Sequence, residues 1–523
     1  MFRLIGLLGG LSLVMDIGTG APLEESLRRA VVATRLGRAA GCTDSEVAAV
    51  LYASLLQHLG CTAYSHEVAR VWGDDVASTR LAFLTDFTDR SDTWRTWVSG
   101  IADATGRSKA RVITTMLAEG KKLDTAGPVA TCDVARSASR QLGLPEPVQV
   151  SLSQMFAMWN GHGYPNVQGA AIQLSTRVVH VASTAVLFTH HAGFDAAVQE
   201  VGRRAGRYLD PDLSDLFRSR ADELLADLDE MDAYQAVLEI EPDPVRLVDE
   251  AELEVVARTF GSLVDLKSPW LHGHSTAVGD LAAAAAKHLG LADNVGDVRV
   301  AGYLHDLGRV GVSSRIWDKP GPLSQSERDQ ARLHPYHTER ILSRVPDLIR
   351  FAALAGQHHE RSDGSGYHRG LSAAQLAMPS RVLAAVDAYR GLVEGRPHRP
   401  QLTEAEAAER LVAQGRAGRL DADAVSGVLT AAGLRRGERR IRPAGLTERQ
   451  AEVLRLVASG ISNREIAKRL VISPRTAEHH VQDVYLKIGA SSRAGAALFA
   501  MEHGLLANLG RSAHARAIDS PPS

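Results

Sequence analysis

The chain carries the pentapeptide LHDLG at residues 304–308 and a similar pentapeptide, LQHLG, at residues 56–60. Two more pairs of similar segments follow in the same order: WNGHGYP at 159–165 with SDGSGYH at 362–368, and TRVVHVAS at 176–183 with SRVLAAVD at 380–387. Three matches in one order predict a duplicated unit. The first copy is the longer one, because 105 residues separate His58 from Gly163 whereas 60 separate Asp306 from Gly366.

The composition predicts that both copies are helical. Aromatic residues make up only 5% of the 523 residues and alanine is abundant, which favours helices over a β-sandwich. Apolar residues recur every three or four positions in Leu23–Ala40, Asp44–Leu59 and Ser275–Leu289. A further helix-rich stretch, Pro211–Glu241, ends at a pair of prolines. We therefore expect an all-α fold with two tandem helical domains, at 1–240 and 241–433, and a smaller helical bundle after them.

The cysteines and the distribution of apolar residues exclude several classes of protein. Three cysteines without CxxC spacing exclude a disulfide scaffold and a structural zinc ribbon, and they suit a reducing cytosol. The segment Met1–Met15 is apolar like a secretion signal, but it continues into Asp16 without a cleavage site of small residues, so we expect a core helix. No apolar run reaches the ~18 residues of a membrane span. We expect a cytoplasmic protein with no membrane partner.

Histidine and aspartate side chains cluster in the second copy. The cluster comprises His274, His305, Asp306, His334, His358, His359 and Asp387. Imidazole and carboxylate groups without thiolates suit iron, manganese or zinc. The surplus of ligands over one tetrahedral ion favours two ions that share a carboxylate. A single histidine among the 20 in the chain is more simply a surface or core residue, and we interpret His272, His288 and His337 in that way.

These residues belong to a longer string that resembles an HD-GYP domain over about residues 270–400. The string includes KPG at 319–321, HHER at 358–361, DGSGY at 363–367 and RVL at 381–383. The resemblance implies an all-helical domain with two or three metal ions, and active members of this family hydrolyse the messenger cyclic di-GMP. It implies that all seven clustered residues are metal ligands, with Asp306 bridging. It also implies that Asp306 and Arg309 are catalytic and that Gly364, Gly366 and Tyr367 form a substrate loop.

Three positions depart from the family pattern. Arg309 replaces the lysine that follows the HD aspartate by three residues; it can contact phosphate but does not readily give up a proton. His368 replaces the proline of the loop signature, which leaves a related nucleotide as an alternative to cyclic di-GMP. Trp270 stands where three-metal members carry a glutamate. We therefore predict two divalent ions, with iron or manganese favoured over zinc.

The first copy lacks this ligand set. Gln57 and His58 stand for His305 and Asp306, Met155 and Phe156 for the two adjacent histidines, Ser183 for Asp387 and approximately Ser26 for His274. Methionine and phenylalanine are not ligands for these hard ions. We interpret the first copy as a degenerate HD-GYP-like domain kept for packing, dimer formation or sensing. We assign no role to Cys61 or His66.

The C-terminal region has a different charge and a different helical pattern. Residues 434–510 carry 13 Lys and Arg against 7 Asp and Glu, whereas the whole chain has a net charge of −2, and this local excess points to DNA. Two capping-box sequences, Thr447–Gln450 and Ser462–Glu465, open two helices. Ser473 caps a third helix that has Pro474 in its first turn and ends near Ile488. The last two helices predict a helix-turn-helix.

The segments NREIA at 463–467 and KIGA at 487–490 lie within a string that resembles a LuxR-type DNA-binding domain over about 445–508. On that resemblance, the side facing the major groove comprises Thr476, Glu478, His479 and Gln482, and the phosphate contacts comprise Lys468, Arg475 and Lys487. The alternative is a helical bundle whose charges are only solvated. We expect a basic linker at 434–445, the helix-turn-helix domain at 446–510 and a disordered tail at 511–523.

Two hypotheses about function follow. In the first, the chain is a metal-dependent phosphodiesterase acting on cyclic di-GMP or a related nucleotide, with a DNA-binding transcriptional output. In the second, it is a non-catalytic regulator whose HD domains sense a nucleotide. Both hypotheses imply DNA and a cyclic dinucleotide or other phosphorylated nucleotide as partners, and the helix-turn-helix leads us to expect a homodimer.

Overall fold

The computed structural model describes residues 1–434 and, toward the C-terminus, 444, 446–458, 460–470, 472–490, 492, 496–497, 499–500, 503 and 505. The predicted linker 434–445, apart from Leu434 and Ala444, and the predicted tail 511–523 lie outside the described residues. The described part is all-α, as predicted. One small exception is an antiparallel pair that the sequence did not predict, between β1 (Phe2–Arg3) and β2 (Leu247–Val248).

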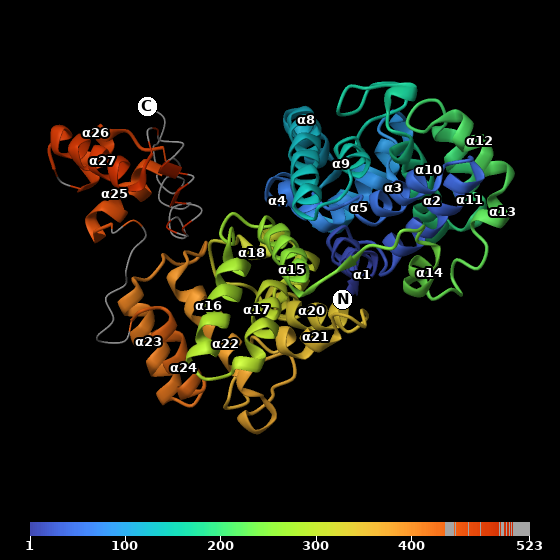
Figure 1. Cartoon of the computed structure of the whole chain (residues 1–523). Helices are drawn as coiled ribbons and strands as arrows, with labels where there is room; N and C mark the ends of the chain where they lie inside the picture. Colours follow the sequence, from blue (N-terminus) through green and yellow to red (C-terminus); the bar gives the residue numbers. More distant parts are fainter. Residues whose placement is uncertain are drawn as a thin grey trace.

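The first half of the molecule, drawn from blue to green in Figure 1, comprises α1 to α14. Its helices are α1 (Leu4–Gly18), α2 (Glu25–Ala39), α3 (Asp44–Leu55), η1 (Cys61–Tyr64), α4 (Ser65–Trp72), α5 (Asp75–Leu84), α6 (Arg90–Asp92), η2 (Thr93–Val98), α7 (Ser99–Thr105), α8 (Lys109–Gln141), α9 (Glu146–Ser153), η3 (Gly169–Ala171), α10 (Leu174–Ala192), α11 (Phe194–Arg204), α12 (Pro211–Ser219), α13 (Ala221–Leu224) and α14 (Ala233–Ile240).

The second half, drawn from yellow-green to orange, comprises β2 to α24. Its helices are α15 (Glu250–Asp265), α16 (His274–His288), η4 (Ala292–Asn294), α17 (Val295–Leu304), η5 (Leu307–Gly311), α18 (Ser314–Trp317), α19 (Gln325–Arg332), α20 (His334–Leu342), α21 (Ile349–Gly356), η6 (Ala373–Gln375), α22 (Met378–Val393), α23 (Glu404–Arg416) and α24 (Ala422–Ala431).

Repeated hydrogen bonds show that the two halves share one design. In the first half, the Asp16 carboxylate accepts from the backbone N–H and hydroxyl of Ser26; in the second, Asp265 accepts from the same groups of Ser275. These bonds align Ser26 with Ser275, so Glu25, not Ser26, stands at the position of His274. The predicted correspondence of His274 with about Ser26 was therefore wrong by one residue. The two sequences are too different around this position to align exactly, and only the equivalent backbone hydrogen bonds show which residues correspond.

Helix α1 joins the two halves rather than leading a separate domain. Its residues Leu4–Asp16 are buried, and one continuous apolar core runs from this helix through both halves to Ala432. A Cβ atom on Gly10 would lie 1.9 Å from Cγ2 of Val345, so only glycine allows α1 to approach the second half so closely. The expected core helix is thus a packing element between the two halves.

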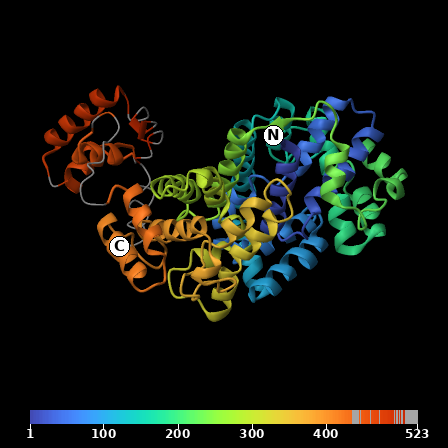
Figure 2. The ribbon, with the colours of Figure 1, turned by 60° about the horizontal axis from the view of Figure 1, so that its bottom comes forward.

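The C-terminal helices α25 (Glu448–Ala458), α26 (Asn463–Leu470) and α27 (Pro474–Ile488) surround a core of their own. The capping bonds predicted for them are present, with Thr447 and Gln450, and Ser462 and Glu465, bonded reciprocally, and with Ser473 accepting from the Thr476 N–H. In Figures 1 and 2 these red helices lie apart from the blue first half, with the second half between them. No helix among the described residues is long and apolar enough to cross a membrane.

Candidate metal centre and DNA-binding surface

Helix ends place the predicted ligands around one buried point of the second half. His274 begins α16, His305 follows α17, and His334 begins α20. His358 and His359 lie just after α21, and Asp387 lies in the middle of α22. Asp306 directly precedes η5. Six of the seven predicted ligands are at most 5% exposed, and His359 is partly buried. The structure therefore brings together every residue that the resemblance named as a ligand.

Six of the seven predicted ligands form two groups of three, each with its donor atoms within 4.8 Å of one another: His274 with His305 and Asp306, and His334 with His358 and His359. Asp306 belongs to the first group and also faces the second. Its Oδ2 atom is 3.5 Å from Nε2 of His274 and 3.2 Å from Nε2 of His305. Its Oδ1 atom is 3.3 Å from Nε2 of His334 and 3.6 Å from Nε2 of His358. One carboxylate thus faces both groups, one oxygen to each.

Backbone carbonyls fix which nitrogen of each imidazole faces the centre. The Nδ1–H groups of His305, His334 and His358 donate to the carbonyl oxygens three residues earlier, at 2.6–2.7 Å. Their Nε2 atoms are then unprotonated when the rings are neutral. Nε2 of His334 lies 3.1 Å from Nε2 of His358, so two lone pairs face each other. Such a pair is stable when a cation lies beside it, which is the arrangement of metal-ligating histidines.

The burial and charge of these side chains also indicate a metal site. Nε2 of His274, Nε2 of His305 and Oδ1 of Asp306 are buried without a hydrogen-bond partner, and buried polar atoms are normally satisfied. Burial alone would raise the pKa of the Asp306 carboxyl, but Arg309 and the imidazoles hold that pKa well below its usual range. Burial holds the pKa of His358 and of His359 well below the usual value. Burial would also lower the pKa of His274, but nearby carboxylates, above all Glu394, instead raise it to about 9. Anionic carboxylates together with the neutral imidazoles of His358 and His359 are donors that suit divalent metal ions.

A carboxylate that the sequence analysis missed orients His274. Oε2 of Glu394 lies 2.8 Å from Nδ1 of His274, and the Glu394 side chain also accepts from Arg390 and Arg396. A carboxylate in this place raises the basicity of the ligating ring and fixes its orientation. Glu394 directly follows α22 and lies seven residues, about two helical turns, after Asp387. This spacing from a predicted ligand was the one feature of the sequence that could have pointed to Glu394.

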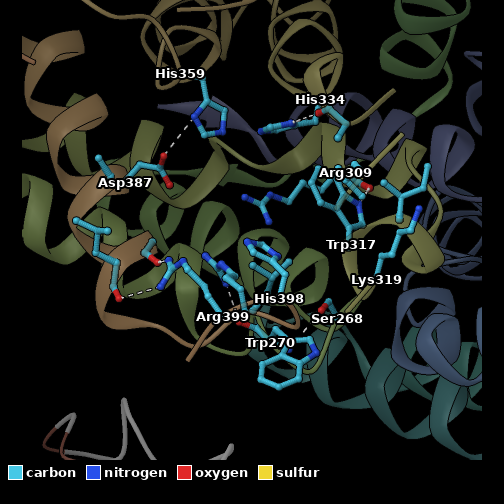
Figure 3. A pocket seen from close by; sticks show the side chains of 18 of the residues that line it. Ser268, Trp270, Arg309, Trp317, Lys319, His334, His359, Asp387, His398 and Arg399 are labelled. Atoms are coloured by element: carbon cyan, nitrogen blue, oxygen red, sulfur yellow. Dashed lines mark hydrogen bonds and ion pairs between the residues drawn. The ribbon is translucent and has the colours of Figure 1, made fainter. Parts of the chain in front are cut away.

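A pocket of about 420 Å³ opens onto the metal centre at His334, His359 and Asp387 (Figure 3). Cationic groups line it, namely Arg309, Lys319, Arg361, Arg396 and Arg399, together with the imidazole of His398. Flat aromatic rings line it as well, namely Trp270, Trp317 and Tyr367. The guanidinium carbon of Arg309 lies 4.8 Å from the Trp317 ring, and its Nε atom lies 2.7 Å from Oδ2 of Asp306. Arg309 therefore reaches both the pocket and the centre.

The predicted substrate loop folds over the histidine pair. The ring of Tyr367 lies 4.7 Å from that of His359. Gly366 is required for a close approach, because a Cβ atom there would lie 2.5 Å from the backbone of Glu360, and Gly364 has a positive φ of 77°. His368, the departure from the family signature, pairs with Glu339 at 3.3 Å rather than lining the pocket. The substitution thus changes the outer side of the loop.

The predicted DNA-contacting residues are all exposed. They are Lys468 on α26 and Arg475, Thr476, Glu478, His479, Gln482 and Lys487 on α27. Ala477, Val481 and Val484 point the other way, into the core of this bundle. Lys487 also donates to the side chain of Gln450, at 2.9 Å, next to the start of α25. The side of α27 that carries Arg475, Thr476, Glu478, His479 and Gln482 is therefore exposed in the described part of this domain.

Comparisons with known proteins assign both regions. Residues 258–424 match the HD domain family, and residues 444–500 match the luxR family of bacterial regulatory proteins. The chain contains an HD domain and a LuxR-type domain. It is 29% identical over 409 residues, 76% of this chain and 88% of the relative, to the 3'3'-cGAMP-specific phosphodiesterase 3 of Vibrio cholerae.

Two further similarities concern the HD domain and its neighbourhood. The cyclic di-GMP phosphodiesterase PA4108 of Pseudomonas aeruginosa is 36% identical over 173 residues, 32% of this chain and 41% of that protein. A solved structure of a cyclic GMP-AMP specific phosphodiesterase of V. cholerae, V-cGAP3, covers 83% of this chain and 98% of its own, with a TM-score of 0.58 and 25% identity. These homologues support a phosphohydrolase of the HD type.

The first half has no equivalent of the metal centre of the HD domain. At the position of His274, the Glu25 carboxylate accepts two hydrogen bonds from Arg80, at 2.8 and 3.0 Å. The buried Arg29 donates to the carbonyl of Ser54, and the ring of His58 stacks on Phe83 at 4.6 Å. In the described residues of this half, Arg80 and Phe83 therefore contact the side chains that stand at the positions of His274 and Asp306.

Proposed function

We propose that the chain is a metal-dependent phosphodiesterase that hydrolyses a cyclic dinucleotide, and that its LuxR-type domain gives this activity a transcriptional output. The observation that carries the proposal is the position of Asp306, whose two carboxylate oxygens face two separate groups of ligands. A shared carboxylate of this kind suits two ions held side by side. The cationic pocket lies directly over these groups.

The residues of the centre and the pocket have distinct tasks in this proposal. His274, His305, His334, His358, His359, Asp306 and Asp387 would hold two divalent ions. When bound, these ions supply Lewis-acid chemistry and offset charge on phosphoryl oxygens. Arg309, held between Asp306 and the Trp317 ring, would bind a phosphate oxygen of the substrate.

The pocket also supports the class of substrate. A cyclic dinucleotide has two phosphodiester groups and two flat bases. Five lysine and arginine side chains suit the first feature, and three aromatic rings suit the second. The two relatives named for 3'3'-cGAMP and for cyclic di-GMP support both compounds as candidate substrates. We expect Gly364 and Gly366 to let Tyr367 close over the bound nucleotide.

The DNA-binding surface follows from α27. We propose that Thr476, Glu478, His479 and Gln482 contact base edges and that Lys468, Arg475 and Lys487 contact phosphates, in a homodimer that binds two half-sites. All seven side chains lie on the exposed surface of the LuxR-type domain.

The proposal is tested by metal analysis and by hydrolysis of cyclic di-GMP and 3'3'-cGAMP, on protein purified without oxygen. We expect about two ions per chain and a turnover that Asp306→Ala abolishes together with the bound metal. The matched control is Asp329→Ala, because Asp329 is exposed on α19. Bound nucleotide without turnover in the metal-loaded protein would contradict the enzyme and support the sensor hypothesis instead.

A further inference from the structure

The first half is longer than the second by a segment that reaches the pocket of the HD domain. Gly60 and Gly308 mark equivalent points, because a Cβ atom on either would lie about 2 Å from a carbonyl oxygen, of Thr131 and His334 respectively. Between Gly60 and Thr131 the first half has η1, α4, α5, α6, η2, α7 and most of α8, whereas between Gly308 and His334 the second half has only the rest of η5, α18 and α19. The helices α4 and α18 pack together.

The first contact comes from α4. Nδ1 of His66 lies 2.6 Å from Oδ2 of Asp318, and Oδ1 of the same carboxylate accepts from the Ser268 hydroxyl at 2.5 Å. The Ser268 oxygen in turn accepts from the backbone N–H of Trp270. Ser268, Trp270 and Lys319, the residue after Asp318, all line the substrate pocket (Figure 3).

The second contact comes from the start of α5. The Asp75 carboxylate is 2% exposed and accepts from Lys267 at 2.6 Å, from the Ser313 hydroxyl at 3.0 Å and from the Ser314 N–H at 2.8 Å. It therefore ties the segment before Trp270 to the segment that begins α18. A buried carboxylate with a paired cation and further donors is well satisfied, and loss of any partner is costly.

We propose that His66 and Asp75 are positioning residues of the HD domain's pocket: from the first half, they hold its two wall segments, 267–270 and 313–319, against each other. Neither residue touches the metal ligands. The role is mechanical, since a wall tied at both points keeps Trp270, Trp317 and Lys319 in place for a large substrate. This assigns a task to the degenerate copy. The kinetic part of the test rests on the proposed function.

The first variant is His66→Ala, with His66→Asn as the conservative replacement, because the asparagine amide can donate from nearly the place of Nδ1. His66 is partly exposed, so its loss leaves the core intact. His162→Ala, which changes an exposed histidine of the same half, is the matched control. Loss of one charge-assisted bond is expected to raise KM for the cyclic dinucleotide about tenfold, and His66→Asn is expected to restore it. Hydrolysis of bis(p-nitrophenyl) phosphate, which is too small to need the wall, is expected to stay unchanged.

Hydrogen–deuterium exchange gives a readout that does not depend on activity. In His66→Ala, backbone amides of 267–271 and 313–319 are expected to exchange faster, while those of α21 and α22 keep their rates and the metal content is unchanged. In Asp75→Asn/Lys267→Met, which removes both buried charges, the same two segments are expected to respond. If exchange in both segments matches the wild type, the proposal is wrong. If exchange rises but the wild type hydrolyses no cyclic dinucleotide, the proposed function fails and the bracing role stands.

Discussion

Nδ1 of His190 lies 3.2 Å from Oε2 of Glu25 in the first half. The second half has the same contact with acid and base exchanged, because His274 lies 2.8 Å from Glu394 at equivalent positions. In the first half, Glu25 also pairs with Arg80. In the second half, His274 faces Asp306 in the metal centre. The two halves therefore share a histidine–glutamate contact at equivalent positions, with the acid and the base exchanged.

The Glu394→Gln variant tests the orienting role of this carboxylate. Glutamine keeps the size of the side chain but removes the negative charge beside Nδ1 of His274. We expect metal affinity to fall about 10- to 100-fold, as for other partners of ligating histidines. Titration of the metal-free protein with Mn²⁺ measures this change. Glu409→Gln, at an exposed glutamate of α23, is the control, and equal affinities in both variants would contradict the role.

Asp16 predicts a pH dependence of stability. Burial, only partly offset by Arg29, raises the pKa of its carboxyl to about 7 from 3.8. Between these values the folded state binds more protons than the unfolded state, so this group makes the free energy of unfolding decrease as the pH rises. In the Asp16→Asn variant the side chain cannot ionise, and its amide oxygen can still accept from Ser26. Relative to the wild type, this variant is expected to gain about 2–3 kcal/mol between pH 5 and pH 8.

Urea denaturation at the two pH values measures that difference. Asp229→Asn, which changes an exposed aspartate of the same half, provides the comparison. A gain that is the same at pH 5 and pH 8 would show that Asp16 is ionised in the folded protein at both values.

Two substitutions on α27 separate positioning from recognition of sequence. Arg475→Ala removes a proposed phosphate contact, so we expect weaker binding to every DNA and a salt dependence whose slope falls by about 1. Gln482→Ala removes a proposed base contact, so we expect a loss of about 1–3 kcal/mol only at the selected operator. Fluorescence anisotropy with an operator selected from random DNA and with a scrambled duplex measures both. The exposed Arg218→Ala is the control, and uniform losses in both α27 variants would contradict the division.

The features that the sequence predicted well are those with a local or chemical requirement. The capping bonds of Ser462 and Ser473 join residues three positions apart, so they could be read from spacing. The histidine and aspartate cluster could be predicted because adjacent His–Asp and His–His pairs need partners if they are buried. The all-α fold followed from helical periodicity in both copies.

The features that could not be predicted depend on contacts between distant parts of the chain. Glu394 lies 120 residues from His274 and between two arginines, which in a sequence suggests a solvated ion pair. His66 meets Asp318 across 252 residues, and nothing near His66 has the spacing of a site. The β1–β2 pair joins strands of two residues each, too short for a pattern of alternation.

The place of α1 has a consequence for the order of folding during synthesis. This helix is synthesised before the second half, but its Gly10 face packs on Val345 of that half. At about 5–20 residues per second, roughly 20–70 s pass before that partner is made. During that time the apolar side of α1 that faces the second half stays uncovered, and exposed apolar surface on a nascent chain is prone to aggregate.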